Sequence, residues 1–299
     1  MDSRIINTPD SGTAAKRPGA IHDLTGAARD LWHSRYLVYQ LTLRDILVRY
    51  KQALMGFAWA ILTPLLVVSA GVLVRIALQH SAGANVGFSS IAGIAVKGLA
   101  WSFFAGATGF AVNVLTANAG LIGKVYFPRE ALPLSAVLAS SFDALIAGTL
   151  LAIALPVLGW RPDWSLAWVP LLLAALFVLT LAFALLVSCA NLFFRDVKYL
   201  VQLVISFGIF FTPVFYEPVT LGARFAPLQM LNPLAPLLEG LRLAIAEGHN
   251  LLVAIVDPAT GIVLWSPWHL AYSAAFAIIG LMACTVIFHR AQHRFAEYL

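Results

Sequence analysis

Long apolar segments with almost no charge constrain this chain more than any other feature. Six of them lie at about residues 54–78, 91–115, 132–158, 166–188, 199–216 and 268–288. Roughly 20 apolar residues in a helix cross the hydrocarbon core of a bilayer. Charged residues make up only 11% of the 299 residues, whereas soluble domains carry about 25%. The pattern predicts an all-α integral membrane protein with six transmembrane helices in residues 54–299, preceded by a cytoplasmic region in residues 1–53.

The positions of Lys and Arg predict the topology. The N-terminal region is rich in both residue types, and the second and fourth connections carry them as well. The connection at residues 79–90 has none. Because short cytoplasmic segments hold an excess of Lys and Arg, we expect both termini in the cytoplasm and the long connection at residues 217–267 outside.

Residues 29–52 are too charged to cross a bilayer, yet they carry an apolar stripe at helical spacing. The pattern predicts an amphipathic helix at the membrane interface, with aromatic rings among the lipid headgroups, after a mobile tail at residues 1–28. A second strip of Leu37, Leu41 and Val48 leaves contact with another protein open. The stripe and its basic flank include Trp32, Arg35, Tyr36, Tyr39, Arg44, Arg49 and Tyr50.

The fifth apolar segment begins at a charged group, Arg195, Asp196 and Lys198, and breaks at Pro213 among aromatic residues. Irregular backbone at membrane depth is tolerated only inside protein or beside a cavity. We therefore interpret the segment as the wall or gate of a pathway, where flat rings contact the C–H faces of sugars; lipid-facing bulk is the alternative. The proposed pathway and gate residues are Phe57, Trp59, Phe207, Phe210, Phe211, Pro213, Phe215 and Tyr216.

The long outer connection contains further apolar elements. Residues 230–248 have early prolines followed by the pattern of a short amphipathic helix, and the apolar run at residues 251–256 is too short to span. We expect short re-entrant helices in the outer leaflet, with an ordinary surface hairpin as the alternative.

Two ionisable residues lie inside predicted spans, Lys97 and Asp143. A charge at the bilayer centre costs about 2.5–3.5 kcal/mol on insertion scales, so each side chain should face protein or water. We expect a structural role for Asp143, accepting bonds from neighbouring helices. A proton relay is the alternative.

The sequence predicts no catalytic residue, no metal site and no cofactor on this chain. His289 and His293 share a helical face, but they lie in a basic tail and are interpreted as interfacial anchors. Residues 120–125 lack both the glycine spacing and the Ser or Thr of a phosphate loop. A membrane-embedded transferase would need paired carboxylates or a His–Asp arrangement, and a nucleic-acid site would need a patterned basic run. The sequence contains neither the arrangement that a transferase needs nor the basic run that a nucleic-acid site needs.

The connection at residues 124–130 combines aromatic and charged side chains around a proline. An exposed aromatic pair beside charges is typical of a docking knob that inserts into a partner, with an interfacial anchor as the alternative. Its residues are Lys124, Tyr126, Phe127, Pro128, Arg129 and Glu130.

Several segments resemble one family: RYKQALMGFAWAILTPLL, LIGKVYFPREALPLSAVLASSFDALIA, CANLFFRDVKYLVQ, FFTPVFY and LNPLAPLLEGLR. They are similar to the membrane subunits of type-two ABC exporters, and especially to permeases that export O-antigen or teichoic acid. The resemblance covers about residues 36–247, and Ala100 replaces a proline that is common in relatives.

The resemblance implies a homodimer in the bacterial inner membrane, paired with two separate ATPase subunits that bind ATP and Mg. It implies that the connection at 124–130 couples to the ATPase and that residues 211–247 form the outer gate. The implied cargo is a lipid-linked polysaccharide on an undecaprenyl carrier. Teichoic acid, capsular polysaccharide, or a small drug or lipid are alternative cargoes, and a proton-coupled transporter is a more distant alternative.

Overall fold

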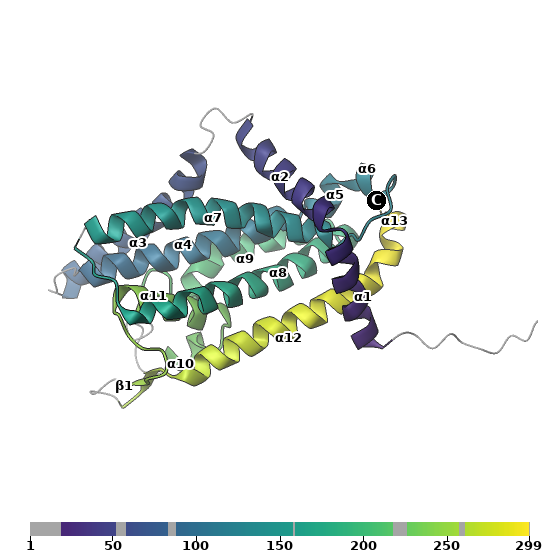
Figure 1. Cartoon of the computed structure of the whole chain (residues 1–299). Helices are drawn as coiled ribbons and strands as arrows, with labels where there is room; N and C mark the ends of the chain where they lie inside the picture. The colour runs from purple at the N-terminus through teal and green to yellow at the C-terminus, as the bar shows by residue number, and fades with distance from the viewer. Residues whose placement is uncertain are drawn as a thin grey trace, which may run out of the picture.

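The computed structural model describes residues 19–51, 58–82, 88–157, 159–217, 226–256 and 261–298. Phe57, one of the proposed pathway residues, lies outside these ranges. Long helices form a bundle, and two shorter helices, α1 and α2, cross one end of it (Figure 1). The long helices are α3 (Ala58–Ala82), α4 (Phe88–Ala111), α7 (Ala131–Val157), α8 (Val169–Phe193), α9 (Val197–Phe211) and α12 (Pro267–Ala291).

The remaining elements are short or lie at the ends of the bundle. They are α1 (Ala20–His33), α2 (Arg35–Lys51), α5 (Val114–Ala117), α6 (Ala119–Ile122), η1 (Trp164–Trp168), α10 (Ala226–Gln229), α11 (Leu234–Ala246), β1 (Ile255–Val256), β2 (Val263–Trp265), η3 (Gln292–Arg294) and α13 (Phe295–Tyr298).

Each predicted apolar segment overlaps one long helix, but the helices differ in length. Four described helices are long and apolar enough to cross a membrane: Ser89–Ala111, Ala131–Val157, Trp164–Phe193 and Pro267–Arg294. The apolar parts of the first and fifth helices, Ile61–Ala77 and Val197–Phe211, are shorter. The 15 residues of α9 extend only about 22 Å at 1.5 Å per residue. The chain is therefore a multi-pass helical membrane protein, and six complete spans stay a prediction.

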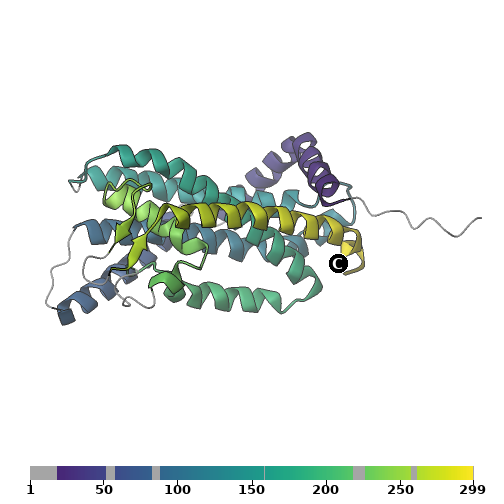
Figure 2. The same ribbon diagram turned by 90° about the horizontal axis from the view of Figure 1, so that it is seen from below.

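Proline ends α9 where the sequence predicts a break. The helix stops at Phe211, and Thr212 adopts an extended conformation with φ −100° and ψ 133°. The ring of Pro213 disfavours a helical conformation at the preceding residue. Figure 2 shows α9 along the lower edge of the bundle, and no α9 residue is buried.

The N-terminal prediction needs a correction. The tail expected at residues 1–28 is too long, because α1 begins at Ala20, and the single helix expected at 29–52 is divided at Ser34. Tertiary contacts order α1: Ala27 is buried, and Asp23 accepts a 2.8 Å bond from Nε of Arg290 at the end of α12. These contacts are distant in sequence, so local pattern could not reveal them.

The outer connection also differs from the prediction in part. The expected helix is present as α11, but it is enclosed by protein on every side rather than amphipathic, since each residue from Leu234 to Ala244 is buried. The apolar run at 251–256 is not a helix. It contributes β1, which pairs antiparallel with β2, so the all-α prediction omitted a small sheet. Trp265 at the end of β2 is buried and donates its Nε1–H to the Leu251 carbonyl at 2.9 Å.

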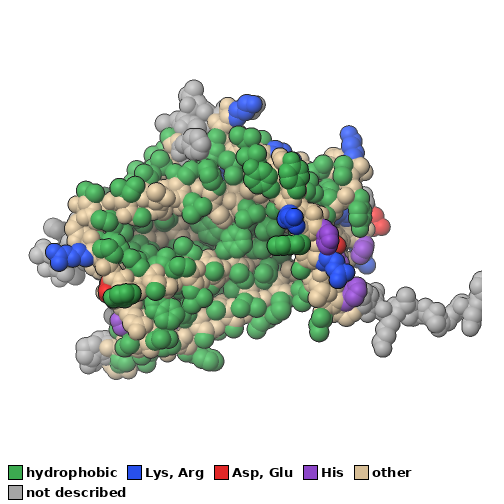
Figure 3. All heavy atoms as spheres, viewed as in Figure 1, with side chains coloured by type: hydrophobic (Ala, Val, Ile, Leu, Met, Phe, Trp, Pro, Cys, Tyr) green, Lys and Arg blue, Asp and Glu red, His purple; other side chains and the backbone are tan. Residues whose placement is uncertain are grey.

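Two buried apolar clusters hold the bundle together. One lies towards α1, α2 and the end of α12 and includes Leu115, Leu132 and Phe288. The other surrounds α11 and includes Leu237 and Trp265. On the face shown in Figure 3, hydrophobic side chains cover most of the helices, and His gathers with Lys and Arg at the end near α1. This distribution suits a protein whose middle contacts lipid.

Candidate functional site

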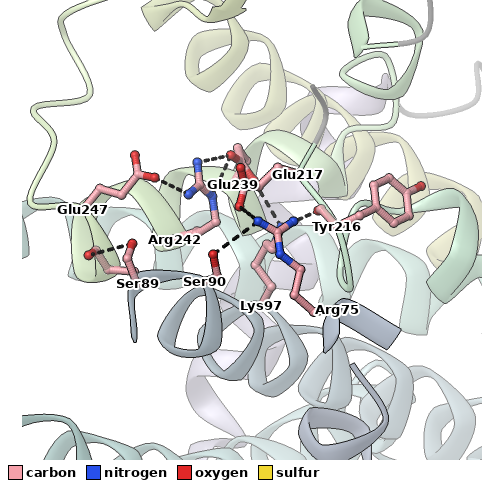
Figure 4. Close-up of polar contacts among 10 residues, drawn as sticks. Arg75, Ser89, Ser90, Lys97, Tyr216, Glu217, Glu239, Arg242 and Glu247 are labelled. Atoms are coloured by element: carbon pink, nitrogen blue, oxygen red, sulfur yellow. Dashed lines mark hydrogen bonds and ion pairs between the residues drawn. The ribbon is translucent and has the colours of Figure 1, made fainter. Parts of the chain in front are cut away.

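A network of charged side chains, here called the outer charge cluster, joins α3, α4, α11 and the segment after α9 (Figure 4). Three positive and three negative side chains balance in number, so the cluster carries no formal net charge. The members are Arg75, Lys97, Glu217, Glu239, Arg242 and Glu247.

Lys97 lies at the centre of this cluster and is only 1% exposed. Its Nζ donates to the Tyr216 carbonyl at 2.7 Å and lies 3.5 Å from Oε2 of Glu239. The other carboxylate oxygen of Glu239 accepts bonds from Nε and Nη2 of Arg242 at 2.8 and 2.6 Å. Glu239 therefore neutralises two buried cations, one on α4 and one on its own helix.

The outer part of the cluster is nearer to solvent. Arg242 reaches Glu247 at 2.5 Å, and Arg75 on α3 reaches Glu217 at 3.0 Å and the Ser90 hydroxyl at 3.2 Å. Burial alone raises the pKa of Glu239, but Lys97 and Arg242 outweigh it, so the pKa lies below its ordinary value. The carboxylate therefore stays ionised.

This cluster also fixes the backbone that follows α9. Lys97 holds the Tyr216 carbonyl, the Tyr216 hydroxyl donates to the Phe210 carbonyl at 2.7 Å, and Gln229 donates to that hydroxyl at 2.9 Å. Asn232 donates to the Thr212 hydroxyl at 3.0 Å. The break at Pro213 is therefore an ordered turn that is bonded to the rest of the bundle.

The structure does not bring the proposed pathway aromatics onto one surface. Phe207, Phe210 and Phe211 are exposed on α9. Phe215 is buried in the cluster around α11, with its ring centroid 6.0 Å from that of Phe210. Trp59 is exposed on α3 and lines a different cavity, described next.

A second polar centre ties α2 to α7. Asp143, on α7, accepts hydrogen bonds from both Arg49 and Tyr50 at the end of α2. Arg49 also reaches the Ser140 hydroxyl at 3.1 Å, and Asp45 accepts from Ser135 at 3.1 Å. Asp143 thus makes the interhelical bonds that its structural role requires. A cavity of about 380 Å³ lies beside this centre, lined by residues that include Trp59, Ser102 and Phe103.

The environment of Tyr50 favours its neutral form. Burial and the neighbouring Asp143 carboxylate raise the pKa of Tyr50 above its ordinary value. Tyr50 therefore stays a hydrogen-bond donor to Asp143 at physiological pH. The sequence placed Arg49 and Tyr50 only in the interface stripe and did not identify them as the partners of Asp143.

The rest of the interface stripe faces outward. Trp32, Tyr36 and Tyr39 are exposed, whereas Val38 and Leu41 on the opposite face are buried against the bundle. Arg35 lies over the Trp32 ring, with its Cζ 5.6 Å from the ring centroid, and Arg44 pairs with Asp45 at 2.8 Å. Together, α1 and α2 thus offer aromatic and basic groups to their surroundings and aliphatic groups to the protein.

The connection at residues 124–130 divides into an exposed tip and an anchored base. Tyr126 is fully exposed and Lys124 is exposed, but Phe127 is 9% exposed and belongs to the apolar cluster near α1. Past Pro128, Arg129 donates to the Gln292 carbonyl, and Glu130 lies 2.9 Å from Nδ1 of His289. The predicted aromatic pair is therefore separated, and its base is bonded to the end of α12.

Glu239 and Arg242 were not among the residues singled out from the sequence. A weak signal was present, because an acid and a base three residues apart on a mostly apolar helix are positioned to pair. Lys97 in a span also requires a carboxylate from elsewhere. Nothing in the local sequence joins these two observations.

Comparison with known proteins identifies relatives over most of the chain. The model of the ABC-2 type transporter family matches residues 36–245. Two O-antigen export system permease proteins RfbA of Klebsiella pneumoniae are each 28% identical over 265 residues, which are 88% of this chain and 95% of theirs. A protein of the same name from Myxococcus xanthus is 27% identical over 271 residues, 90% of this chain and 97% of its own.

Replacing Glu239 with Gln should lower the stability of the folded protein strongly. The change leaves Lys97 and Arg242 buried without their shared carboxylate, and breaking a buried ion pair costs about 3–5 kcal/mol. Glu247→Gln is the matched control, because Glu247 lies at the rim with a side chain 38% exposed. Thermal unfolding in detergent measures both variants, and equal midpoints would contradict the central role of Glu239.

Asp143→Asn should loosen α2 without unfolding the bundle. The variant loses one charge-assisted hydrogen bond, so amide hydrogen exchange in α2 should become about tenfold faster. Asp30→Asn on α1 is the control, since Asp30 is exposed and its side chain makes no hydrogen bond or ion pair within the described parts of the chain. Unchanged exchange in α2 would show that Asp143 does not anchor this helix.

Proposed function

This chain belongs to the ABC-2 type transporter family, and we propose that it exports a lipid-linked polysaccharide of the O-antigen kind across the bacterial inner membrane. The observation that carries the proposal is similarity to three O-antigen export permeases over nearly their whole length. The chain is a membrane subunit for transport rather than a catalytic enzyme. Teichoic acid, capsular polysaccharide and smaller lipids are the alternative cargoes of the same machinery.

The permease acts as a homodimer in this proposal. Two features of α9 support a homodimer. The helix has no buried residue in the single chain, and one of its faces is apolar at helical spacing. The residues of that face are Leu200, Leu203, Val204, Phe207 and Phe211. A second copy lays its own α9 opposite this one, and the glycan moves between them. The exposed rings suit a sliding polymer, because they offer weak and repeated contact without a tight binding site.

ATP hydrolysis takes place on two partner ATPase subunits that hold ATP and Mg. The connection at 124–130 docks on them through its exposed tip, Tyr126. Its base transmits movement into the bundle, because Arg129 and Glu130 are bonded to Gln292 and His289 near the end of α12. Both termini lie on this cytoplasmic side, and the interface helices rest among the lipid headgroups there.

The outer charge cluster gives the opposite end of the pathway a fixed frame. It bonds Tyr216, just past the break in α9, to Lys97 on α4. Movement of the cytoplasmic end then changes the spacing of the two α9 helices, while the turn at Pro213 stays attached to α4 and α11. In this proposal the pathway opens beside this turn.

Loss of the gene should cause lipid-linked glycan to accumulate inside the cell. Export follows assembly on the carrier, so a blocked permease leaves the completed glycan on the cytoplasmic face. Carrier-linked glycan is measured by extraction and mass spectrometry in the deletion strain and in a strain complemented with the intact gene. A deletion strain without accumulation, but with altered drug or phospholipid transport, would contradict the polysaccharide assignment.

Tyr126→Ala should weaken association with the ATPase. A docking residue in a partner's socket is worth about 2 kcal/mol or more, so copurification should fall by roughly tenfold or more. Trp164→Ala is the matched control, because Trp164 is an equally exposed aromatic residue in η1. Phe127→Ala is a separate case, since Phe127 is packed in the core and its loss lowers stability. Unchanged copurification and export with Tyr126→Ala would refute the docking role.

A further inference from the structure

A small polar pocket lies at the end of the bundle where α9 begins. It has a volume of about 260 Å³. The side chains come from α5, α6, the end of α8, the start of α9 and α13, and Figure 1 shows α5, α6 and α13 at the same end as α1. The pocket is lined by Asn113, Thr116, Ala119, Asn191, Leu192, Arg195, Lys198 and Tyr298.

The lining of this pocket has an excess of hydrogen-bond donors and positive charge. Arg195 and Lys198 both line it, and neither forms an ion pair with any described residue. Nζ of Lys198 lies over the Tyr199 ring, 4.9 Å from the ring centroid. No carboxylate is among the described lining residues, and Asp196 between the two bases lies outside the set.

Asn191 supplies a further polar side chain to the lining. It is only 2% exposed, and its Oδ1 accepts the backbone N–H of Lys198 at 3.1 Å. The Nδ2 group of the same amide makes no hydrogen bond within the described residues and is available as a donor. Two cations without an ion pair, beside an amide that can donate, favour an anion as the occupant of the pocket.

The surroundings place this pocket at the level of lipid headgroups. Phe194, Tyr199 and Tyr298 are exposed aromatic side chains near it, a residue type that gathers at the membrane–water boundary. The exposed aliphatic face of α9 starts at Leu200, two residues after Lys198. An anion with a hydrocarbon chain can occupy both regions at once, with its head in the pocket and its chain along the helix.

We propose that the pocket formed by Asn191, Arg195 and Lys198 binds the phosphate headgroup of a membrane lipid. Phosphate offers several acceptor oxygens and a negative charge, which match an amide donor, a guanidinium and an ammonium group. An ordinary anionic phospholipid and a polyprenyl phosphate share this chemistry. The site stands independently of the cargo assigned above, and the two sources of phosphate are separated by experiment.

The test measures lipid binding to the full chain by native mass spectrometry in a neutral detergent. Dioleoyl phosphatidylglycerol and undecaprenyl phosphate serve as the two probes. Combined Arg195→Gln and Lys198→Gln substitutions should weaken binding by about tenfold or more, the size of one lost charge-assisted hydrogen bond. The matched control combines Arg29→Gln and Lys51→Gln, which remove two exposed bases elsewhere on the same side.

Asn191→Asp is a second and sharper variant. It preserves the oxygen that accepts the Lys198 backbone N–H and replaces the Nδ2 amide donor with a negatively charged oxygen. Phosphate binding should therefore fall while the fold is kept. If this variant does not fold, the combined Arg195→Gln and Lys198→Gln variant still tests the site.

The outcomes separate the sources. Weakened binding of both probes with an unaffected control supports a general phosphate-headgroup site. Weakening of undecaprenyl phosphate alone supports a site for the carrier. Unchanged binding of both lipids in the Arg195 and Lys198 variant overturns the proposal, and so does a loss confined to ATPase association, which would identify a protein contact instead.

Discussion

The carboxylate of Glu239 is the interaction on which the half of this protein around α11 depends. It lies between Lys97 of α4 and Arg242 of α11, and all three side chains are buried. Two cations inside a membrane protein would be prohibitive without it. Because Lys97 also holds the Tyr216 carbonyl, one ionised group determines how α11 packs and where the turn after α9 is held.

The half of the bundle that carries α1 and α2 depends on a different set of polar contacts. Asp143 holds the end of α2, while Glu130 and Asp23 contact the end of α12 through His289 and Arg290. Each of these contacts joins segments that are far apart in the sequence. The interface helices and the connection at 124–130 are therefore parts of one bonded layer, and a force on Tyr126 has a route into α12.

Between these two polar layers, α9 is the least enclosed of the long helices. It ends at Phe211, before Pro213, and buries none of its residues in the single chain. A short helix with an exposed apolar face between two anchored ends suits a surface that meets a partner or a moving cargo. The same position places Arg195 and Lys198, at its start, beside the pocket that contains the buried amide of Asn191.

The sequence by itself determined the membrane class, the approximate positions of the long helices and the break at Pro213. These depend on local apolar length and on the steric effect of proline, which a short window contains. It also indicated that Lys97 and Asp143 need partners, but it could not say which. Only the tertiary structure decided that Lys97 pairs with Glu239, that Asp143 meets Arg49 and Tyr50, and that α1 is ordered from Ala20. Those choices depend on which distant segments pack together, and a local pattern carries no record of that packing.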